Sequence, residues 1–292
     1  MGKVKRIVLL LLVITGLYIL YNQVSAFDWF SKTDNKTTQS ALTKGIDVIE
    51  VDISSVSTTI IPEDREDVKA IYNGKDKLTV REHGDTIEVS VRHKGFGWLD
   101  WSPFSKKKKL IIYIPEDYHR KIRISLGSGN VNFSGQSKSK PVKLDELKVD
   151  IGSGNMDLKN MTINNFEQNV ASGNVDIKSL QTETGSFDVS SGSLDVKEYT
   201  GAIQANVSSG EIDFQVDQLT DSIDIEVSSG DVKLDLPNNA DFTLDGDVTS
   251  GDIICELPLT SKNIKKRSIE GIHGSGKYKI DLDVSSGDIT IR

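Results

Sequence analysis

The stretch VSSGEIDF, residues 207–214, carries a pattern that returns along most of the chain. The same phrase stands just before it as VSSGSLDV (189–196) and just after it as VSSGDVKL (227–234). After each glycine, polar and apolar residues alternate, which is the two-residue period of a strand with one buried face. The pattern therefore predicts short strands that recur with the phrase.

Eight copies of the phrase align on their glycines, and most neighbouring copies are 18 to 21 residues apart. These glycines are Gly129, Gly154, Gly173, Gly192, Gly210, Gly230, Gly251 and Gly287. A single coil of this length cannot bury a core, but stacked coils can. Glycine suits a corner of such a coil because it tolerates positive φ and close backbone approach. We therefore predict an all-β fold, a β-solenoid of about 20-residue coils, over residues 126–292.

The apolar positions after each glycine are predicted to form two internal columns. The first comprises Val131, Met156, Val175, Leu194, Ile212, Val232, Ile253 and Ile289, and the second Phe133, Leu158, Ile177, Val196, Phe214, Leu234, Cys255 and Ile291. Cys255 is the chain's single cysteine, and its place in a column predicts a buried small hydrophobe. Aromatic residues make up only 7% of the chain, so no aromatic-rich core is expected.

Residues 1–30 are predicted to be a transmembrane helix. A basic cluster precedes the apolar run Ile7–Tyr21, and extension of this run to Phe27 gives a helix of about 31 Å, enough for the hydrocarbon core. This anchor would leave the N-terminus in the cytoplasm and the bulk of a single-pass membrane protein outside it. The alternative is a signal peptide cleaved after Ala26, which closes the small-residue stretch Val24–Ala26. A polar linker, residues 31–45, follows.

Residues 46–125 are β-rich but lack the regular phrase. Ser54-Ser55-Val56 is interpreted as a degenerate first coil, and the region as either first coils or an N-terminal β cap. The segments 85–92 and 109–117 alternate well and are predicted to pair with each other as strands.

The loop 93–109 has the most unusual composition in the chain. Aromatic and basic residues gather in it, namely Phe96, Trp98, Trp101, Phe104, Lys106, Lys107, Lys108 and Lys109. This combination fits a membrane interface, where aromatics enter the headgroup region and lysines meet anionic lipid. It also fits a protein-binding site. The alternative is that the aromatics cap the open end of the solenoid, which would otherwise expose strand edges.

Asp157, Asp176, Asp195 and Asp213 occupy one slot in four consecutive copies of the phrase. If the coils stack in register, these carboxylates lie about 4.8 Å apart on one outer face. Such a column is a candidate Ca²⁺ site, because Ca²⁺ takes carboxylate oxygens and would relieve the repulsion. The alternative is a hydrated acidic face, and no other cofactor is predicted.

The sequence contains no complete enzyme motif. The phrase GIHGSGK, residues 271–277, follows the phosphate-binding loop pattern up to its lysine, but Tyr278 stands where Ser or Thr is required. The four histidines lack metal-ligand spacing. Beyond residue 26 the chain carries 32 basic and 43 acidic groups, which disfavours nucleic-acid binding.

The repeated SSGD-apolar-x-apolar phrase and the C-terminal VSSGDITIR, behind an N-terminal anchor, resemble the bacterial putative-adhesin family of envelope β-solenoid proteins. Within this family, the chain resembles the membrane-anchored LiaG-type members. The resemblance covers residues 46–292 and implies an exported, repetitive β protein.

We therefore expect a non-catalytic, membrane-anchored protein that offers a binding or adhesion surface in the cell envelope. Its partners would be an envelope protein, a lipid headgroup or a wall glycan. The alternatives are a regulatory or scaffold partner of a membrane protein in envelope-stress sensing and, third, a polysaccharide-acting enzyme.

Overall fold

A computed structural model describes residues 36–92 and 108–292 of the chain. Residues Thr37–Arg292 form one compact unit, and this unit is all-β. The described part of the chain has no helix with the length and apolarity needed to span a membrane. The predicted anchor, residues 1–30, lies outside the described residues, as do residues 93–107 of the aromatic and basic loop.

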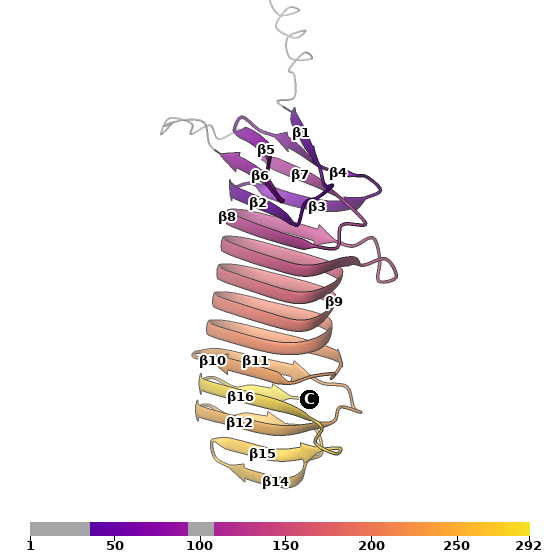
Figure 1. Ribbon diagram of the computed structural model, residues 1–292. Coiled ribbons are helices and arrows are strands. Elements are labelled where there is room, and N and C mark those ends of the chain that lie inside the picture. The colour runs from indigo at the N-terminus through magenta and orange to yellow at the C-terminus, as the bar shows by residue number, and fades with distance from the viewer. Residues whose placement is uncertain (1–35, 93–107) are drawn as a thin grey trace, which may run out of the picture. The chain divides into compact units, whose positions relative to one another are not determined.

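The strands follow one another with short connections (Figure 1). Their bounds are β1 (Lys36–Leu42), β2 (Val48–Ser55), β3 (Ser57–Glu63), β4 (Asp67–Asn73), β5 (Lys77–His83), β6 (Thr86–Arg92), β7 (Lys109–Pro115), β8 (Lys121–Ser134), β9 (Val142–Gln218), β10 (Ile223–Val227), β11 (Gly230–Asp235), β12 (Phe242–Ser250), β13 (Ile253–Cys255), β14 (Thr260–Lys265), β15 (Ser268–His273), β16 (Tyr278–Ser286) and β17 (Ile289–Ile291).

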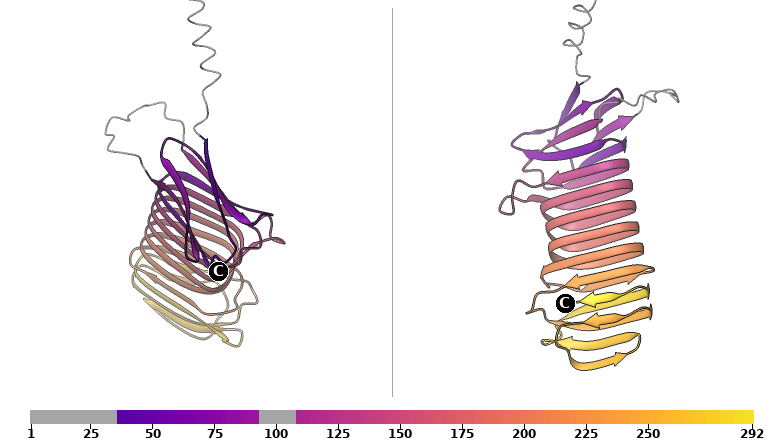
Figure 2. Two further views of the ribbon diagram at one scale, coloured as in Figure 1. Left: turned by 45° about the horizontal axis from the view of Figure 1, so that its top comes forward. Right: turned by 180° about the vertical axis from the view of Figure 1, so that it is seen from behind.

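The coils stack in parallel and in register, which confirms the predicted β-solenoid. β8 pairs with the start of β9 from Lys121↔Glu146 to Ser134↔Lys159. β9 then continues as one ribbon through several coils, visible from the front and from behind (Figures 1 and 2). The phrase at Ser54-Ser55-Val56 belongs to the same stack, because Ser55 pairs with Ser128 of β8.

The repeated glycines form a column at one corner of the stack. All eight have φ between 118° and 149°. A Cβ built on Gly173 would lie 1.7 Å from the carbonyl oxygen of Gly154 in the preceding coil. On each of the other stacked glycines that follow Gly129 in the sequence, a Cβ would lie 1.7–1.9 Å from the carbonyl oxygen of the glycine in the neighbouring coil. Glycine is therefore required both by backbone conformation and by the approach of the next coil.

The order of coils departs from the sequence at the C-terminal end. The predicted columns place the coil of Ile253 next to that of Val232, but the structure inserts the last coil between them. Val232 pairs with Ile289, which in turn pairs with Ile253. The phrase is alike in every copy, so its pattern could not specify this order.

The prediction that residues 85–92 and 109–117 pair with each other is wrong. β6 pairs in parallel with β2, and β7 pairs in parallel with β3. These two strands are therefore successive sides of one coil, stacked on the coil made by β2 and β3. Alternation alone shows that a strand has a buried face and does not identify its neighbour.

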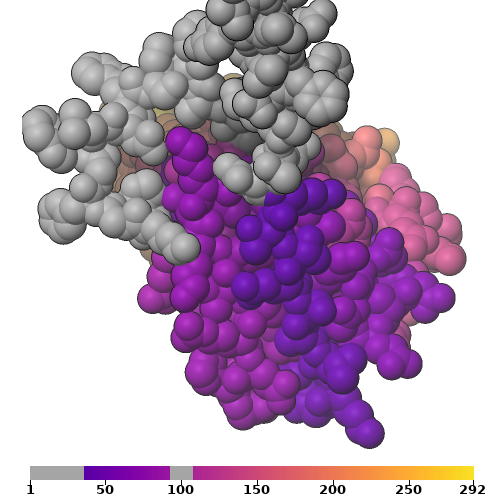
Figure 3. All heavy atoms as spheres, turned by 90° about the horizontal axis from the view of Figure 1, so that it is seen from above, coloured from indigo at the N-terminus to yellow at the C-terminus, as the bar shows by residue number. Residues whose placement is uncertain are grey.

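Both ends of the stack change to antiparallel pairing. At the N-terminal end β5 pairs with β6 and β4 pairs with β7, and these residues spread over the end in the view from above (Figure 3). At the C-terminal end β15 pairs with β12, and β14 pairs with β15. The end strands thus cover edges that the terminal coils would otherwise expose.

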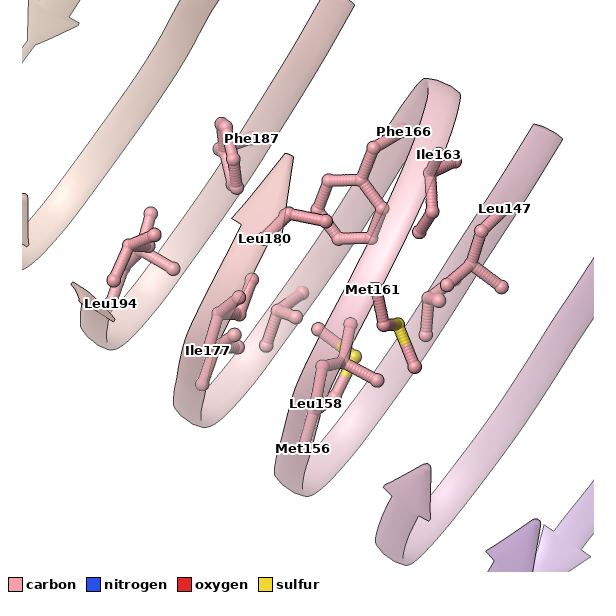
Figure 4. Close-up of a cluster of buried hydrophobic side chains, with 14 of the residues drawn as sticks. Leu147, Met156, Leu158, Met161, Ile163, Phe166, Ile177, Leu180, Phe187 and Leu194 are labelled. Carbon is pink, nitrogen blue, oxygen red and sulfur yellow. The ribbon is translucent and has the colours of Figure 1, made fainter. Parts of the chain in front are cut away.

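The core consists of inward-pointing side chains stacked coil upon coil (Figure 4). Contrary to the expectation from composition, its middle coils hold an aromatic cluster. The Phe187 ring centroid lies 5.4 Å from that of Phe166 and 5.2 Å from that of Phe214. Tyr199 packs against the rings of Phe187 and Phe214, so a few aromatic residues form a cluster when the stack brings them together.

Candidate binding surfaces

The predicted aspartate column lies beside a column of lysines. Asp157, Asp176, Asp195 and Asp213 each stand three residues after a stacked glycine, and Lys159, Lys178 and Lys197 stand two residues further on. The carboxylates of Asp157 and Asp195 lie 3.0 and 2.6 Å from the amines of Lys159 and Lys197. Lys197 donates a hydrogen bond to Asp195, which raises the pKa of the lysine, and the charges of Asp213 and Asp176 raise it further.

These lysines supply positive charge where the Ca²⁺ hypothesis places a cation. In the described ranges, no three His, Cys, Asp or Glu side chains come close enough to hold a metal ion. The arrangement matches the alternative, a hydrated face of paired charges. Ca²⁺ binding at Asp157, Asp176, Asp195 and Asp213 stays a prediction.

A groove of about 640 Å³ runs across the coils just before the glycine corner. Its lining includes the polar residues Asp52, Ser125, Asp150, Asn169 and Asp188. These residues come from successive coils, because Asp52 pairs with Ser125 and Ser125 with Asp150. Acidic and neutral residues therefore alternate down the groove.

Hydrogen bonds hold this polar column in place. Asn169 donates from Nδ2 to Asp150 Oδ1 over 2.7 Å, and Asn206 donates in the same way to Asp188 over 2.9 Å. Each amide thus lies between the carboxylates of the coils on either side of it, so that like charges are not direct neighbours. At the upper end, the Arg92 guanidinium lies 3.3 Å from the Asp52 carboxylate.

The groove is hollow because small residues form its floor. Gly127, Gly152 and Ala171 stand where later coils have serine, as at Ser190 and Ser208. A Cβ on Gly127 would lie 2.6 Å from the Ser54 carbonyl oxygen, and one on Gly152 would lie 2.7 Å from the Gly127 carbonyl oxygen. The missing side chains leave a channel flanked by carboxylate, amide and hydroxyl groups, which suit a ligand rich in hydroxyl donors.

This groove was not predicted from the sequence. Its signal was the position four residues before each glycine, where acid and neutral residues alternate in Asp150, Asn169, Asp188 and Asn206. The apolar positions two and four residues after each glycine give a stronger signal, because their hydrophobic alternation is more regular.

The coils near the C-terminus carry a denser acidic patch. Glu226, Asp283 and Asp247 lie side by side, and Asp281 lies between Asp224 and Asp245 in the adjacent column. Lys279 donates to Asp281 over 2.5 Å, and this hydrogen bond raises the pKa of the lysine. The patch holds six of the chain's 43 acidic residues.

Of the aromatic and basic residues predicted as a binding loop, Lys108 and Lys109 fall within the described residues. The Lys108 amine lies 2.9 Å from the Asp76 carboxylate, which is only 7% exposed. Tyr72 donates to the same carboxylate over 2.8 Å. Phe96, Trp98, Trp101, Phe104, Lys106 and Lys107 lie outside the described residues.

Cys255 is half-buried, not fully buried as predicted for its column. Its Sγ lies 3.8 Å from the Leu257 carbonyl oxygen. Burial raises the pKa of this thiol. A raised pKa lowers the fraction of thiolate, so the residue has the character of a packing side chain.

The fold defines a class of protein, a β-solenoid with covered ends and no helix in its described part. Residues 46–292 match the family described as Toastrack DUF4097, and the chain belongs to that family. Among curated proteins, none matches the chain.

The chain is also similar, at low sequence identity, to solved structures, and the first of these shares its fold. One from Parabacteroides distasonis, described as a putative adhesin, is 12% identical, with 88% of this chain and 97% of that chain covered and a TM-score of 0.52. A putative adhesin from Parabacteroides merdae is 14% identical, with 88% and 96% covered and a TM-score of 0.49. A protein from P. distasonis described as a putative lipid binding protein is 13% identical, with 88% and 97% covered and a TM-score of 0.39.

Proposed function

We propose that this chain is a non-catalytic binding protein of the bacterial cell envelope, and that the groove before the glycine corner receives a wall glycan. The observation that carries this proposal is the groove itself, about 640 Å³ and continuous across successive coils. A groove that repeats with each coil suits a ligand that also repeats, and a polysaccharide does so. Carboxylate, amide and hydroxyl groups along it can accept and donate hydrogen bonds to sugar hydroxyls.

Binding of the full chain to purified wall sacculi tests this proposal. The double substitution Asp150→Asn and Asp188→Asn removes two carboxylates of the groove and should weaken retention at least tenfold. The matched control is Asp224→Asn with Asp283→Asn, which removes two carboxylates from the acidic patch outside the groove. Equal retention of both variants and the unaltered chain would reject the groove as the glycan site.

We further propose that residues 1–30 anchor the chain in the membrane, with the solenoid outside the cell, as in the LiaG-type proteins that the sequence resembles. The support is the basic cluster followed by an apolar run in the sequence. Fractionation of cells and protease treatment of protoplasts test it. Recovery in the membrane fraction with a protease-sensitive solenoid is expected, whereas release into the medium would indicate cleavage after Ala26.

A second candidate function is a regulatory or scaffold role beside a membrane protein. Its support is the composition of loop 93–109, whose described end is fixed to the solenoid by the Lys108–Asp76 pair. Photo-crosslinking in cells from a probe at position 98 tests this role. A discrete membrane-protein adduct is expected, and lipid or wall adducts alone would reject a protein partner.

A further inference from the structure

An insertion lengthens one coil near the start of the regular stack. Gly129 and Gly154 are 25 residues apart, whereas the next glycines follow at about 19 residues. The added residues form the loop 135–141 between β8 and β9, which projects from the side of the stack (Figures 1 and 2). In repeat proteins such insertions often mark the binding face.

The insertion loop is fixed by contacts on two sides. Gln136 donates from Nε2 to Glu116 Oε2 over 3.0 Å, which joins the loop to the turn after β7. Lys138 reaches the other way, with its amine 2.6 Å from the Glu198 carboxylate. Such anchoring reduces the entropy that a ligand would otherwise have to overcome in ordering the loop.

A cavity of about 330 Å³ lies between this loop and the turn 115–119. Its floor is apolar and comprises Pro62, Ile114, Pro115, Tyr118, Pro141 and Val142. Ile114, Tyr118 and Val142 are buried. The volume lies at the small end of the range for ligand pockets, so the cavity suits a small ligand with an apolar portion.

The rim of the cavity carries charges without partners. In the part of the chain that the structure describes, the side chains of Asp117, Lys140 and Lys143 form no ion pair or hydrogen bond. His119 places Nδ1 3.2 Å from the Lys143 carbonyl oxygen. Because a carbonyl only accepts, Nδ1 is the donor in this hydrogen bond, and in the tautomer with its proton on Nδ1 the ring offers Nε2 as an acceptor.

We propose that this cavity binds the C-terminal end of a short peptide. The terminal carboxylate lies between the two lysine amines, and the last side chain rests on the proline-rich floor. Asp117 and the Nε2 of His119 are available to the peptide's amide or ammonium groups. A phosphate group would leave the apolar floor unused, so the lining favours the peptide end. The site is separate from the groove and does not depend on its proposed role.

The test is a titration of the full chain, in detergent micelles, with alanyl-alanine and with its C-terminal amide. The dipeptide should bind at millimolar concentration or below, and the amide at least tenfold more weakly. The double substitution Lys140→Gln and Lys143→Gln should weaken dipeptide binding at least tenfold. The matched control, Lys265→Gln with Lys266→Gln near the other end of the stack, should leave it unchanged.

Three results would overturn the proposal. The first is equal affinity for the dipeptide and its amide. The second is no dipeptide binding by a chain whose unfolding transition shows that it is folded. The third is inorganic phosphate binding as tightly as the dipeptide and displacing it, which would identify a general anion patch. Since the lysines are exposed, their substitution should leave the denaturant midpoint of the chain unchanged, so loss of binding in the variant is interpretable.

Discussion

Two corners of the middle coils turn the chain by different means. At the glycine corner, φ is between 118° and 149° and the next coil leaves no room for a Cβ. At the other corner, six residues later in three successive coils, Asn160, Ser179 and Glu198 turn with φ of 55°, 60° and 56°. The second conformation is the left-handed helical region, which L-residues enter at moderate cost.

This difference explains which corner is visible in the sequence. The glycine corner is fixed twice, by φ and by contact between coils, so glycine recurs in every copy of the phrase. The left-handed corner is fixed only by φ, so residues as unlike as Asn, Ser and Glu occupy it. Mutations at the two corners should therefore change the free energy of unfolding by different amounts and for different reasons.

The largest effect is expected for Gly173→Ala. Its Cβ would lie 1.7 Å from the Gly154 carbonyl oxygen, so the coils must separate locally. The free energy of unfolding should fall by about 3–5 kcal/mol, from overpacking and backbone strain together. Denaturant titration measures it. The control is Gly84→Ala, where φ is 64° and nothing lies within 4 Å of the added Cβ. An equal loss at both sites would show that contact between coils is unimportant.

A smaller effect of opposite sign is expected for Gln168→Leu, on the segment that leads into the glycine corner. Gln168 is fully buried, and neither polar atom of its amide has a hydrogen-bond partner. Leucine removes this desolvation cost, so the free energy of unfolding should rise by about 1–3 kcal/mol. The exposed Gln204→Leu is the control and should change it by less than about 0.5 kcal/mol. A loss of stability at position 168 would mean that the amide is satisfied in solution.

At the left-handed corner, Ser179→Val should lower the free energy of unfolding by about 1–2 kcal/mol, because a β-branched residue resists positive φ. Ser179→Gly relieves that strain but adds freedom to the unfolded chain, so its effect should stay below about 1 kcal/mol. Denaturant titration of both variants sharpens the comparison. A loss at Ser179→Gly as large as that of Gly173→Ala would refute a corner held by φ alone.

The smallest effect concerns an ion pair on the outer face before the glycine corner. A hydrogen bond from Lys148 lowers the pKa of Glu167 below its ordinary value of 4.5. The pair therefore adds stability above pH 4.5, and this is lost as the pH falls through the lowered pKa. Both side chains are more than a third exposed, so the contribution is about 0.3 kcal/mol. The stability difference between the unaltered chain and Glu167→Gln should shrink between pH 7 and pH 3. A constant difference would assign the effect to packing.

Much of the fold could be predicted from the repeated phrase, since hydrophobic alternation gives strands and a period near 20 residues gives stacked coils. The order of the last coils could not, because copies such as VSSGDVKL and VSSGDITI offer the same edges to any neighbour. The partners of β6 and β7 could not be predicted either, because hydrophobic alternation shows that a strand has a buried face but does not identify its neighbour. Which strands pair depends on the path that the connecting segments take between one coil and the next.

The candidate sites were harder to predict. The groove depends on small residues, Gly127, Gly152 and Ala171, whose role appears only when their coils lie side by side. The lysines beside the aspartate column stand two residues away on the same face, so strand periodicity could have indicated their pairing. The insertion loop 135–141 was visible as one long interval between glycines, but its opposite wall comes from the turn 115–119.

The most direct test of this stacking is a disulfide between neighbouring coils. With Cys255→Ser as background, Lys233→Cys and Thr290→Cys should form a disulfide under mild oxidation, because Lys233 and Thr290 are register partners. Neighbouring parallel strands are about 4.8 Å apart, within disulfide range, whereas coils two apart are not. The same test with Lys233→Cys and Ile254→Cys should give no disulfide. Crosslinking of the second pair and not of the first would show that the coils follow the sequence, and would contradict the glycine column Gly230–Gly287–Gly251 on which this account rests.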